Sequence, residues 1–128
     1  EYIIKHKTLV DRQHFDPVVE GMRRVVYEPG GTARRARVDS VVVCGKTGTV
    51  ENYRGSLKLR NHSVFIAFAP MDKPKIAISV FIENAGGGGG SWAAPIASLM
   101  IEQYLKGKVK PSAKEKRILD AILLQKER

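Results

Sequence analysis

The sequence predicts an α+β fold in which a three-stranded antiparallel sheet is flanked by helices. Three observations support this prediction. Apolar residues recur at helical spacing towards both ends, β-branched runs occupy the middle, and a short Pro-bounded turn joins two of those runs. With 128 residues, 43% hydrophobic and 27% charged, the chain has the size and composition of one small globular domain.

The first predicted helix begins at Asp16, because Asp16 followed by Pro17 is typical of an N-cap and a first helical turn. Its apolar residues recur at helical spacing and form one face: Val18, Val19, Met22, Val25 and Val26. Gly30 and Gly31 can supply the left-handed residue with which helices commonly end. The helix is therefore predicted to end there.

Three strands are predicted after this helix: residues 41–44, which end on Gly45, and then residues 64–69 and 76–82. Residues 70–74, between the last two, have about the length of a hairpin loop. In the third strand, small or apolar residues occupy both alternations. We therefore expect this strand to be covered on both faces by helices.

Two helices are predicted at the C-terminal end. The glycine run 86–90 is a flexible loop by composition, and Ser91 can cap a helix that continues to about Leu105 and is stopped by Gly107. This helix is apolar almost all round, which predicts that it is buried. Ser112 and the glutamate three residues later have capping-box spacing and open a last helix. Its apolar face comprises Ile118, Leu119, Ile122 and Leu123.

The net charge of +9 raises the hypothesis of a nucleic-acid-binding module, because clustered Lys and Arg attract phosphate backbones. The excess lies in three clusters, at 34–37, 73–75 and 106–116, and solvated loops with a helix surface are the favoured interpretation. The histidines have no metal-ligand spacing, so no metal or other cofactor is expected. The single Cys44 is interpreted as a small core residue rather than a catalytic thiol.

The residue types that carry chemistry are concentrated in Gly-Lys-Thr-Gly-Thr, residues 45–49, at the end of the first predicted strand. A phosphate-binding loop would need a glycine at position 40, which is Ser40, so that interpretation is rejected. The same residues suit an acyl-transfer site that binds a peptide. Lys46 supplies positive charge for a substrate carboxylate, and Thr47 and Thr49 supply hydroxyl groups that can hydrogen-bond to it.

The two remaining features of this segment are backbone features. Gly48 has no side chain, so a peptide can lie against the strand. The amide of Thr49 can stabilise a developing oxyanion, an interaction worth about 3 kcal/mol in related chemistry.

The neighbouring motifs resemble one family in their order along the chain. They are Gly21-Met22 in the first helix, Gly31-Thr32-Ala33, residues 45–52, residues 61–70, residues 74–84 and residues 86–97. This series is similar to the class B high-molecular-mass penicillin-binding proteins of the elongation type, over roughly residues 3 to 106. The resemblance implies a β-lactamase/transpeptidase-like fold, of which this chain holds the C-terminal portion with the last three strands of a five-stranded sheet.

The resemblance also implies an activity. Such enzymes are D,D-transpeptidases, in which a serine forms an acyl-enzyme with a D-Ala-D-Ala stem peptide or with a β-lactam. It implies catalytic and substrate-binding roles for Lys46, Thr47, Gly48 and Thr49. His62 opens a later strand and is a weaker candidate for a substrate contact.

The family's Ser-x-x-Lys and Ser-x-Asn motifs occur nowhere in this sequence. We expect them upstream, in a missing N-terminal part of the same protein, and we expect residues 1–128 alone to be inactive, with 1–107 as core and 108–128 as a helical extension. A β-lactamase or D,D-carboxypeptidase of the same fold stays open as the alternative, ahead of a nucleic-acid-binding module.

The resemblance further implies the cell-elongation machinery as partner and a location on the extracytoplasmic, periplasmic face of the membrane. No run of about 20 apolar residues occurs in the sequence, so the anchor is expected outside it. With two strands of the sheet missing, an unpaired strand edge is expected to promote self-association.

Overall fold

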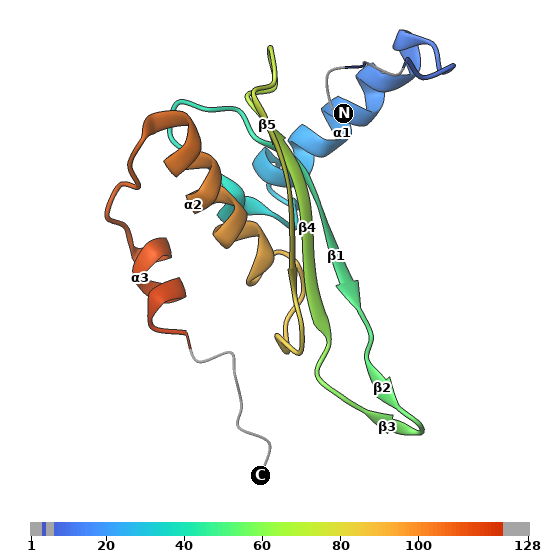
Figure 1. Ribbon diagram of the computed structural model, residues 1–128, viewed down its shortest axis with the longest axis vertical. Helices are drawn as coiled ribbons and strands as arrows, with labels where there is room; N and C mark the ends of the chain where they lie inside the picture. Colours follow the sequence, from blue (N-terminus) through green and yellow to red (C-terminus); the bar gives the residue numbers. More distant parts are fainter. Residues whose placement is uncertain (1–3, 5–6, 122–128) are drawn as a thin grey trace.

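The structure is a computed structural model that describes residue 4 and residues 7–121. Figure 1 shows a small sheet with the long helix α2 along one side and helix α1 crossing one end. The helices are η1 (Arg12–His14), α1 (Phe15–Tyr27), η2 (Arg34–Ala36), α2 (Ala93–Lys106) and α3 (Ala113–Leu119). The strands are β1 (Cys44–Val50), β2 (Tyr53–Arg54), β3 (Leu57–Lys58), β4 (His62–Ala69) and β5 (Ile76–Ile82).

The main sheet has the order β1-β4-β5, with both neighbouring pairs antiparallel. The predicted three-stranded antiparallel sheet with flanking helices is therefore confirmed. In this register Thr47 pairs with Phe65 and Phe65 with Val80, which places the three side chains on one face. Strands β2 and β3 form a separate hairpin that extends beyond the sheet in Figure 1 and that the sequence analysis did not predict.

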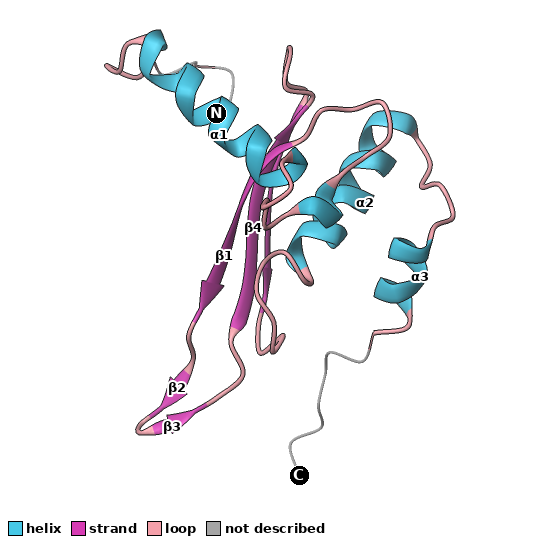
Figure 2. Ribbon diagram, turned by 180° about the vertical axis from the view of Figure 1, so that it is seen from behind, coloured by secondary structure: helices cyan, strands magenta, loops and turns pink. Residues whose placement is uncertain are grey.

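One face of the sheet forms the core with α2. Phe65 and Ala67 of β4 are buried there, together with Val80 of β5 and with Ala97 and Ile101 of α2. Figure 2 shows α2 along this side, with α3 beyond it. Burial of these apolar side chains is the main stabilising contribution to the fold.

The opposite face is only partly covered. Helix α1 packs against β1, and its Met22 lies near Phe68, whereas α2 packs on the core face. Ile66 is 48% exposed and Phe81 is 54% exposed on this face. The expectation that β5 is covered on both sides is therefore wrong for the described residues. Small and apolar residues on both faces of β5 indicated that both faces are buried, but only one face packs against a helix.

Two element boundaries differ from prediction at the N-terminal side. Helix α1 begins at Phe15 rather than at Asp16, because the short η1 turn leads directly into it. The helix ends at Tyr27, and its C-cap Glu28 is extended, with φ −73° and ψ 155°. Gly31 therefore does not end the helix. A glycine is needed at this position because a Cβ there would overlap the carbonyl oxygen of Val25.

Helix α2 begins at Ala93, and Ser91 does not cap it. Gly107 ends it as predicted, with a left-handed φ of 73°. Helix α2 is not buried all round, since Met100 is 52% exposed and Tyr104 is 64% exposed.

Helix α3 confirms half of the capping box, because the Ser112 hydroxyl accepts a hydrogen bond from the backbone NH of Glu115 at 3.1 Å. Leu119, which was assigned to the apolar face of this helix, is 76% exposed. The other two residues predicted for that face, at 122 and 123, lie outside the described residues. None of the helices in the described part of the chain is long and apolar enough to cross a membrane.

Candidate functional site

The Lys-Thr-Gly sequence lies in the middle of strand β1, whereas the apolar pattern alone placed it at the end of the strand. Pairing with β4 continues from Cys44 opposite Phe68 to Val50 opposite His62. The predicted strand at 41–44 was placed too early, and only Cys44 of those four residues belongs to β1. Because β1 has one neighbour in the described sheet, its outer edge leaves backbone groups available to an extended peptide.

The alternation of the strand separates the predicted site residues onto two faces. Lys46 is opposite Ile66 and shares the open face with it, whereas Thr47 and Thr49 are on the α2 side. The Lys46 side chain is exposed, and its Nζ donates a hydrogen bond to the carbonyl oxygen of Thr47 at 2.8 Å. The structure therefore brings the two threonines together on one face and leaves the lysine on the other.

Thr32 is a neighbour of the site that sequence reasoning did not identify. Its Oγ1 lies 2.8 Å from Oγ1 of Thr47, a hydrogen bond in which either hydroxyl can donate. The Gly31-Thr32-Ala33 turn was noted only as a family feature. The tight turn that Gly31 permits is what brings Thr32 beside β1.

The glycine loop, residues 86–90, packs directly against β1. The amide of Gly89 donates to the carbonyl oxygen of Gly48 at 3.1 Å. The buried Ser63 hydroxyl donates to the carbonyl oxygen of Gly88 at 3.0 Å. A Cβ at Gly89 would overlap the carbonyl oxygen of Val64, and one at Gly90 would overlap the carbonyl oxygen of Thr32. Residues 86–90 form a loop, as predicted, and the glycines permit its close backbone packing against β1.

His62 begins β4 on the open face, opposite Val50. Its Nδ1 accepts a hydrogen bond from the backbone NH of Asn84 at 2.9 Å, and its ring lies 5.3 Å from that of Phe81. These contacts give His62 a structural role at the end of the β4–β5 pair. A substrate contact through this residue stays a prediction.

Cys44 is fully buried at the start of β1. Burial raises the pKa of its thiol, so the thiolate that a nucleophile needs is disfavoured. This environment agrees with its interpretation as a core residue.

Trp92 is the N-cap residue of α2, and a side chain of α3 contacts its ring. The guanidinium carbon of Arg117 lies 4.2 Å from the centre of its ring, and Arg117 also donates to the carbonyl oxygen of Ser91 at 2.8 Å. Trp92 therefore connects α3 to the end of the glycine loop.

The chain matches the penicillin binding protein transpeptidase domain over residues 3–102. A peptidoglycan D,D-transpeptidase of Haemophilus influenzae, MrdA, is 40% identical over 97 residues, which are 66% of this chain and 15% of that protein. The D,D-transpeptidase PbpA of Mycobacterium tuberculosis is 36% identical over 78 residues, which are 58% of this chain and 16% of that protein.

Solved structures give the same result. The structure of Pseudomonas aeruginosa PBP2 in complex with WCK 5153 aligns with a TM-score of 0.64 and 33% identity, covering 81% of this chain and 22% of that one. Penicillin-binding protein A of M. tuberculosis, as an imipenem acyl-enzyme complex, aligns with a TM-score of 0.61 and 31% identity, covering 78% of this chain and 21% of that one.

The chain therefore belongs to the penicillin-binding protein transpeptidase domain family, and the resemblance to the class B enzymes of the penicillin-binding protein 2 type is confirmed. The transpeptidase-like fold is confirmed with it. The chain spans about one sixth of the length of the curated relatives that it matches.

Proposed function

We propose that this chain is the part of a peptidoglycan D,D-transpeptidase that binds the peptide, and that the complete protein cross-links stem peptides through a serine acyl-enzyme. The observation that carries the proposal is the geometry of β1, an edge strand that presents Lys46 on one face and, on the other, the Thr47 hydroxyl held by a hydrogen bond to Thr32. An extended peptide can add to such an edge by main-chain hydrogen bonds.

In this proposal each residue of the motif has one role. Thr47 and Thr49 hydrogen-bond the substrate carboxylate, Lys46 supplies positive charge, and Gly48 allows close approach of the peptide backbone. The amide of Thr49 stabilises the oxyanion that forms when the carbonyl is attacked. The nucleophile itself is supplied from outside residues 1–128, because the sequence contains no Ser-x-x-Lys motif.

The remaining expectations belong to the same proposal. Residues 1–107 form the C-terminal core portion of the transpeptidase domain, and 108–128 form a helical extension. The open face and free strand edges receive the missing N-terminal part, and they favour self-association when that part is absent. The name of one relative supports an action of the complete protein on peptidoglycan, and the imipenem acyl-enzyme complex of another supports the binding of β-lactams. From the family resemblance we also propose a location at the extracytoplasmic membrane face and the cell-elongation machinery as partner.

A titration of the isotope-labelled chain tests the proposal by NMR. The probe is Nα-acetyl-Lys-D-Ala-D-Ala, and the matched control is the same peptide with two L-alanines. We expect the D,D-peptide to move the amide resonances of Gly48 and Thr49 more than the L,L-peptide does, and Lys46→Met to weaken that response. Equal responses to the two stereoisomers, or none, would contradict the proposal.

The same samples test the nucleic-acid alternative. Binding of a single-stranded oligonucleotide that falls steeply with salt, without any response to the D,D-peptide, would favour a basic binding module.

A further inference from the structure

Helix α3 is attached to the rest of the molecule by polar side chains rather than by an apolar face. It has seven residues, and none of them is buried. A helix this short is not stable by itself, so contacts with other elements decide whether it forms. Figure 2 shows α3 beyond α2, away from the sheet. It also lies beyond residues 3–102, over which the chain matches the family, so the shared domain does not account for it.

Arg117 attaches α3 to the end of the glycine loop. Its guanidinium donates to the carbonyl oxygen of Ser91 at 2.8 Å, and its guanidinium carbon lies 4.2 Å from the centre of the Trp92 ring. The same ring lies against the loop itself, because a Cβ at Gly87 would be 3.2 Å from two atoms of the indole. The Trp92 ring therefore contacts both α3 and the glycine loop.

The glycine loop in turn lies on the threonine face of β1. The amide of Gly89 donates to the carbonyl oxygen of Gly48 at 3.1 Å. A Cβ at Gly88 would lie 2.7 Å from Oγ1 of Thr49, so the loop backbone is close to that hydroxyl. A shift of the loop would therefore move the groups that border Gly48 and Thr49.

Lys114, three residues before Arg117 and next to it on the helix surface, attaches α3 to a second segment. Its Nζ donates to the carbonyl oxygen of Arg37 at 2.9 Å and to the buried Ser98 hydroxyl at 2.7 Å. The Ser98 hydroxyl also lies 3.4 Å from the carbonyl oxygen of Arg35. The backbone around η2 is therefore held by α2 and α3 together.

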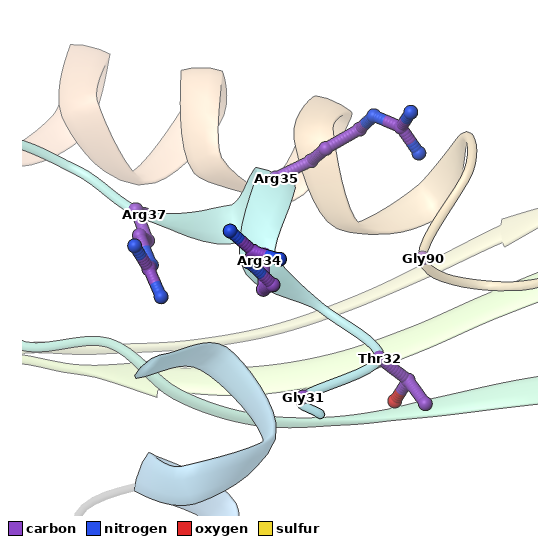
Figure 3. Close-up of a pocket in the computed structure, with 6 residues that line it drawn as sticks. All are labelled: Gly31, Thr32, Arg34, Arg35, Arg37 and Gly90. Carbon is purple, nitrogen blue, oxygen red and sulfur yellow. The ribbon is translucent and has the colours of Figure 1, made fainter. Parts of the chain in front are cut away.

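The two segments that α3 contacts, residues 31–37 and the glycine loop, meet beside β1. The Thr32 hydroxyl is hydrogen-bonded to that of Thr47 at 2.8 Å, and a Cβ at Gly90 would overlap the carbonyl oxygen of Thr32. Next to this contact, Figure 3 shows a cavity of about 440 Å³, lined by three arginines of the first segment and by Gly90. An unfilled cavity supplies no packing contacts across it, so contacts elsewhere hold the two segments relative to each other.

We propose that α3 is a clamp on the peptide-binding wall, in which Arg117 fixes the glycine loop and Lys114 fixes residues 31–37 against β1. Both are positioning residues, because they act through the loop and through Thr32. The proposal rests on the proposed function and extends it to a helix outside the matched domain. Since no residue of α3 is buried, loss of its attachment loosens the wall without unfolding the chain.

Three measurements on the labelled 128-residue chain test the clamp. Hydrogen exchange of the Gly89 amide reports how firmly the loop is held on β1. A titration with Nα-acetyl-Lys-D-Ala-D-Ala, followed at the amide of Gly48, reports the affinity for the peptide. Trp92 is the only tryptophan in the sequence, so its fluorescence emission reports the contact with Arg117.

Arg117→Ala is the decisive variant. We expect exchange of the Gly89 amide to become about tenfold faster, the equivalent of one lost hydrogen bond, and the peptide to bind about threefold more weakly. The emission of Trp92 should shift to longer wavelength. Arg117→Lys keeps a cation beside the ring and should restore part of the affinity. Lys116→Ala removes the same charge from an exposed position of α3 and should match the wild type in all three measurements.

Lys114→Met tests the second attachment separately. It should speed exchange of the Ala36 amide, which donates to the carbonyl oxygen of Ala33 at 2.8 Å, by about threefold or more. The Gly89 amide should keep its exchange rate. A change at Gly89 without one at Ala36 would contradict the role given to Lys114.

Three outcomes separate the clamp from the proposed function. If Gly89 exchange and peptide affinity are the same in Arg117→Ala as in Lys116→Ala, the clamp is overturned and the proposed function stands. If exchange in Arg117→Ala rises by the same factor throughout β4 as at Gly89, the variant has lowered global stability and the clamp is again overturned. If the peptide moves Gly48 in none of the proteins, the proposed function fails and the clamp fails with it.

Discussion

The two faces of strand β1 differ in how completely this chain builds them. On the α2 side, the hydroxyl of Thr47 is hydrogen-bonded to that of Thr32. The carbonyl oxygen of Gly48 accepts a hydrogen bond from the amide of Gly89 in the glycine loop. On the other side, Lys46 is exposed and bonded only to its own backbone neighbour, next to the half-exposed Ile66. The hydroxyl half of the peptide site is therefore preorganised within the chain, whereas the lysine half depends on whatever covers the open face.

The largest predicted difference concerns the two faces of β4. Phe65→Ala removes a fully buried ring and should lower the free energy of unfolding by about 3–5 kcal/mol. Ile66→Ala, the next residue on the open face, should cost about 1 kcal/mol or less, because the side chain is 48% exposed. Urea denaturation measures both. Equal losses would mean that the open face is covered in solution, for example by self-association.

The glycine loop gives the next largest effect. Gly89→Ala would force a Cβ against the Val64 carbonyl oxygen and should destabilise the fold by about 3 kcal/mol. Gly21→Ala is the matched control, because no atom lies within 4 Å of a Cβ there and the residue is inside α1. That change should stabilise by up to about 1 kcal/mol. If thermal unfolding shows that Gly89→Ala is also harmless, the loop does not pack on β1 as described.

The hydroxyl pair gives a smaller effect. Thr32→Val removes the partner of Thr47 while keeping the shape of the side chain, and should cost about 1 kcal/mol in unfolding free energy. Thr49→Val is the comparison, since its hydroxyl has no hydrogen-bond partner within the described residues, and it should change stability by less than about 0.5 kcal/mol. A larger loss of unfolding free energy in Thr49→Val than in Thr32→Val would show that the hydrogen bond from Thr32 does not stabilise Thr47.

The smallest predicted effect is the pH dependence contributed by Lys114. Desolvation lowers its pKa below the ordinary value of 10.5, so in the pH range just below that value the unfolded chain binds more protons than the folded chain. Stability contributed by this group therefore rises as the pH increases towards 10.5. Urea denaturation at several alkaline pH values should show this rise in the wild type and not in Lys114→Met. A rise of the same size in the variant would assign it to other groups.

The sequence was sufficient to predict an element where local signals mark both its beginning and its end. Strand β5 was predicted at its observed bounds, because the turn at 70–74 precedes it and Asn84, with a left-handed φ of 51°, follows it. The capping serine of α3 was found from Ser112 and Glu115 alone. The family motifs likewise indicate Lys46 to Thr49 as the candidate site, and the catalytic and binding roles of these residues stay a prediction.

The sequence was insufficient where tertiary pairing decides the structure. Strand β1 contains two glycines and little apolar surface, and it is a strand because β4 pairs with it along its whole length. The contacts of Thr32 and Gly89 with β1 join segments that are distant in the chain, so no local pattern reveals them. The β2–β3 hairpin is polar and exposed, and only the left-handed Gly55, with φ 63°, marks its turn.

The central claim is that residues 1–128 carry a peptide-binding wall without the nucleophile, and intact-protein mass spectrometry tests it most directly. The chain is incubated with an excess of a penicillin and its mass is compared with that of the untreated chain. The account predicts no increase in mass. A stable adduct of one penicillin, mapped to a serine of this chain, would contradict it.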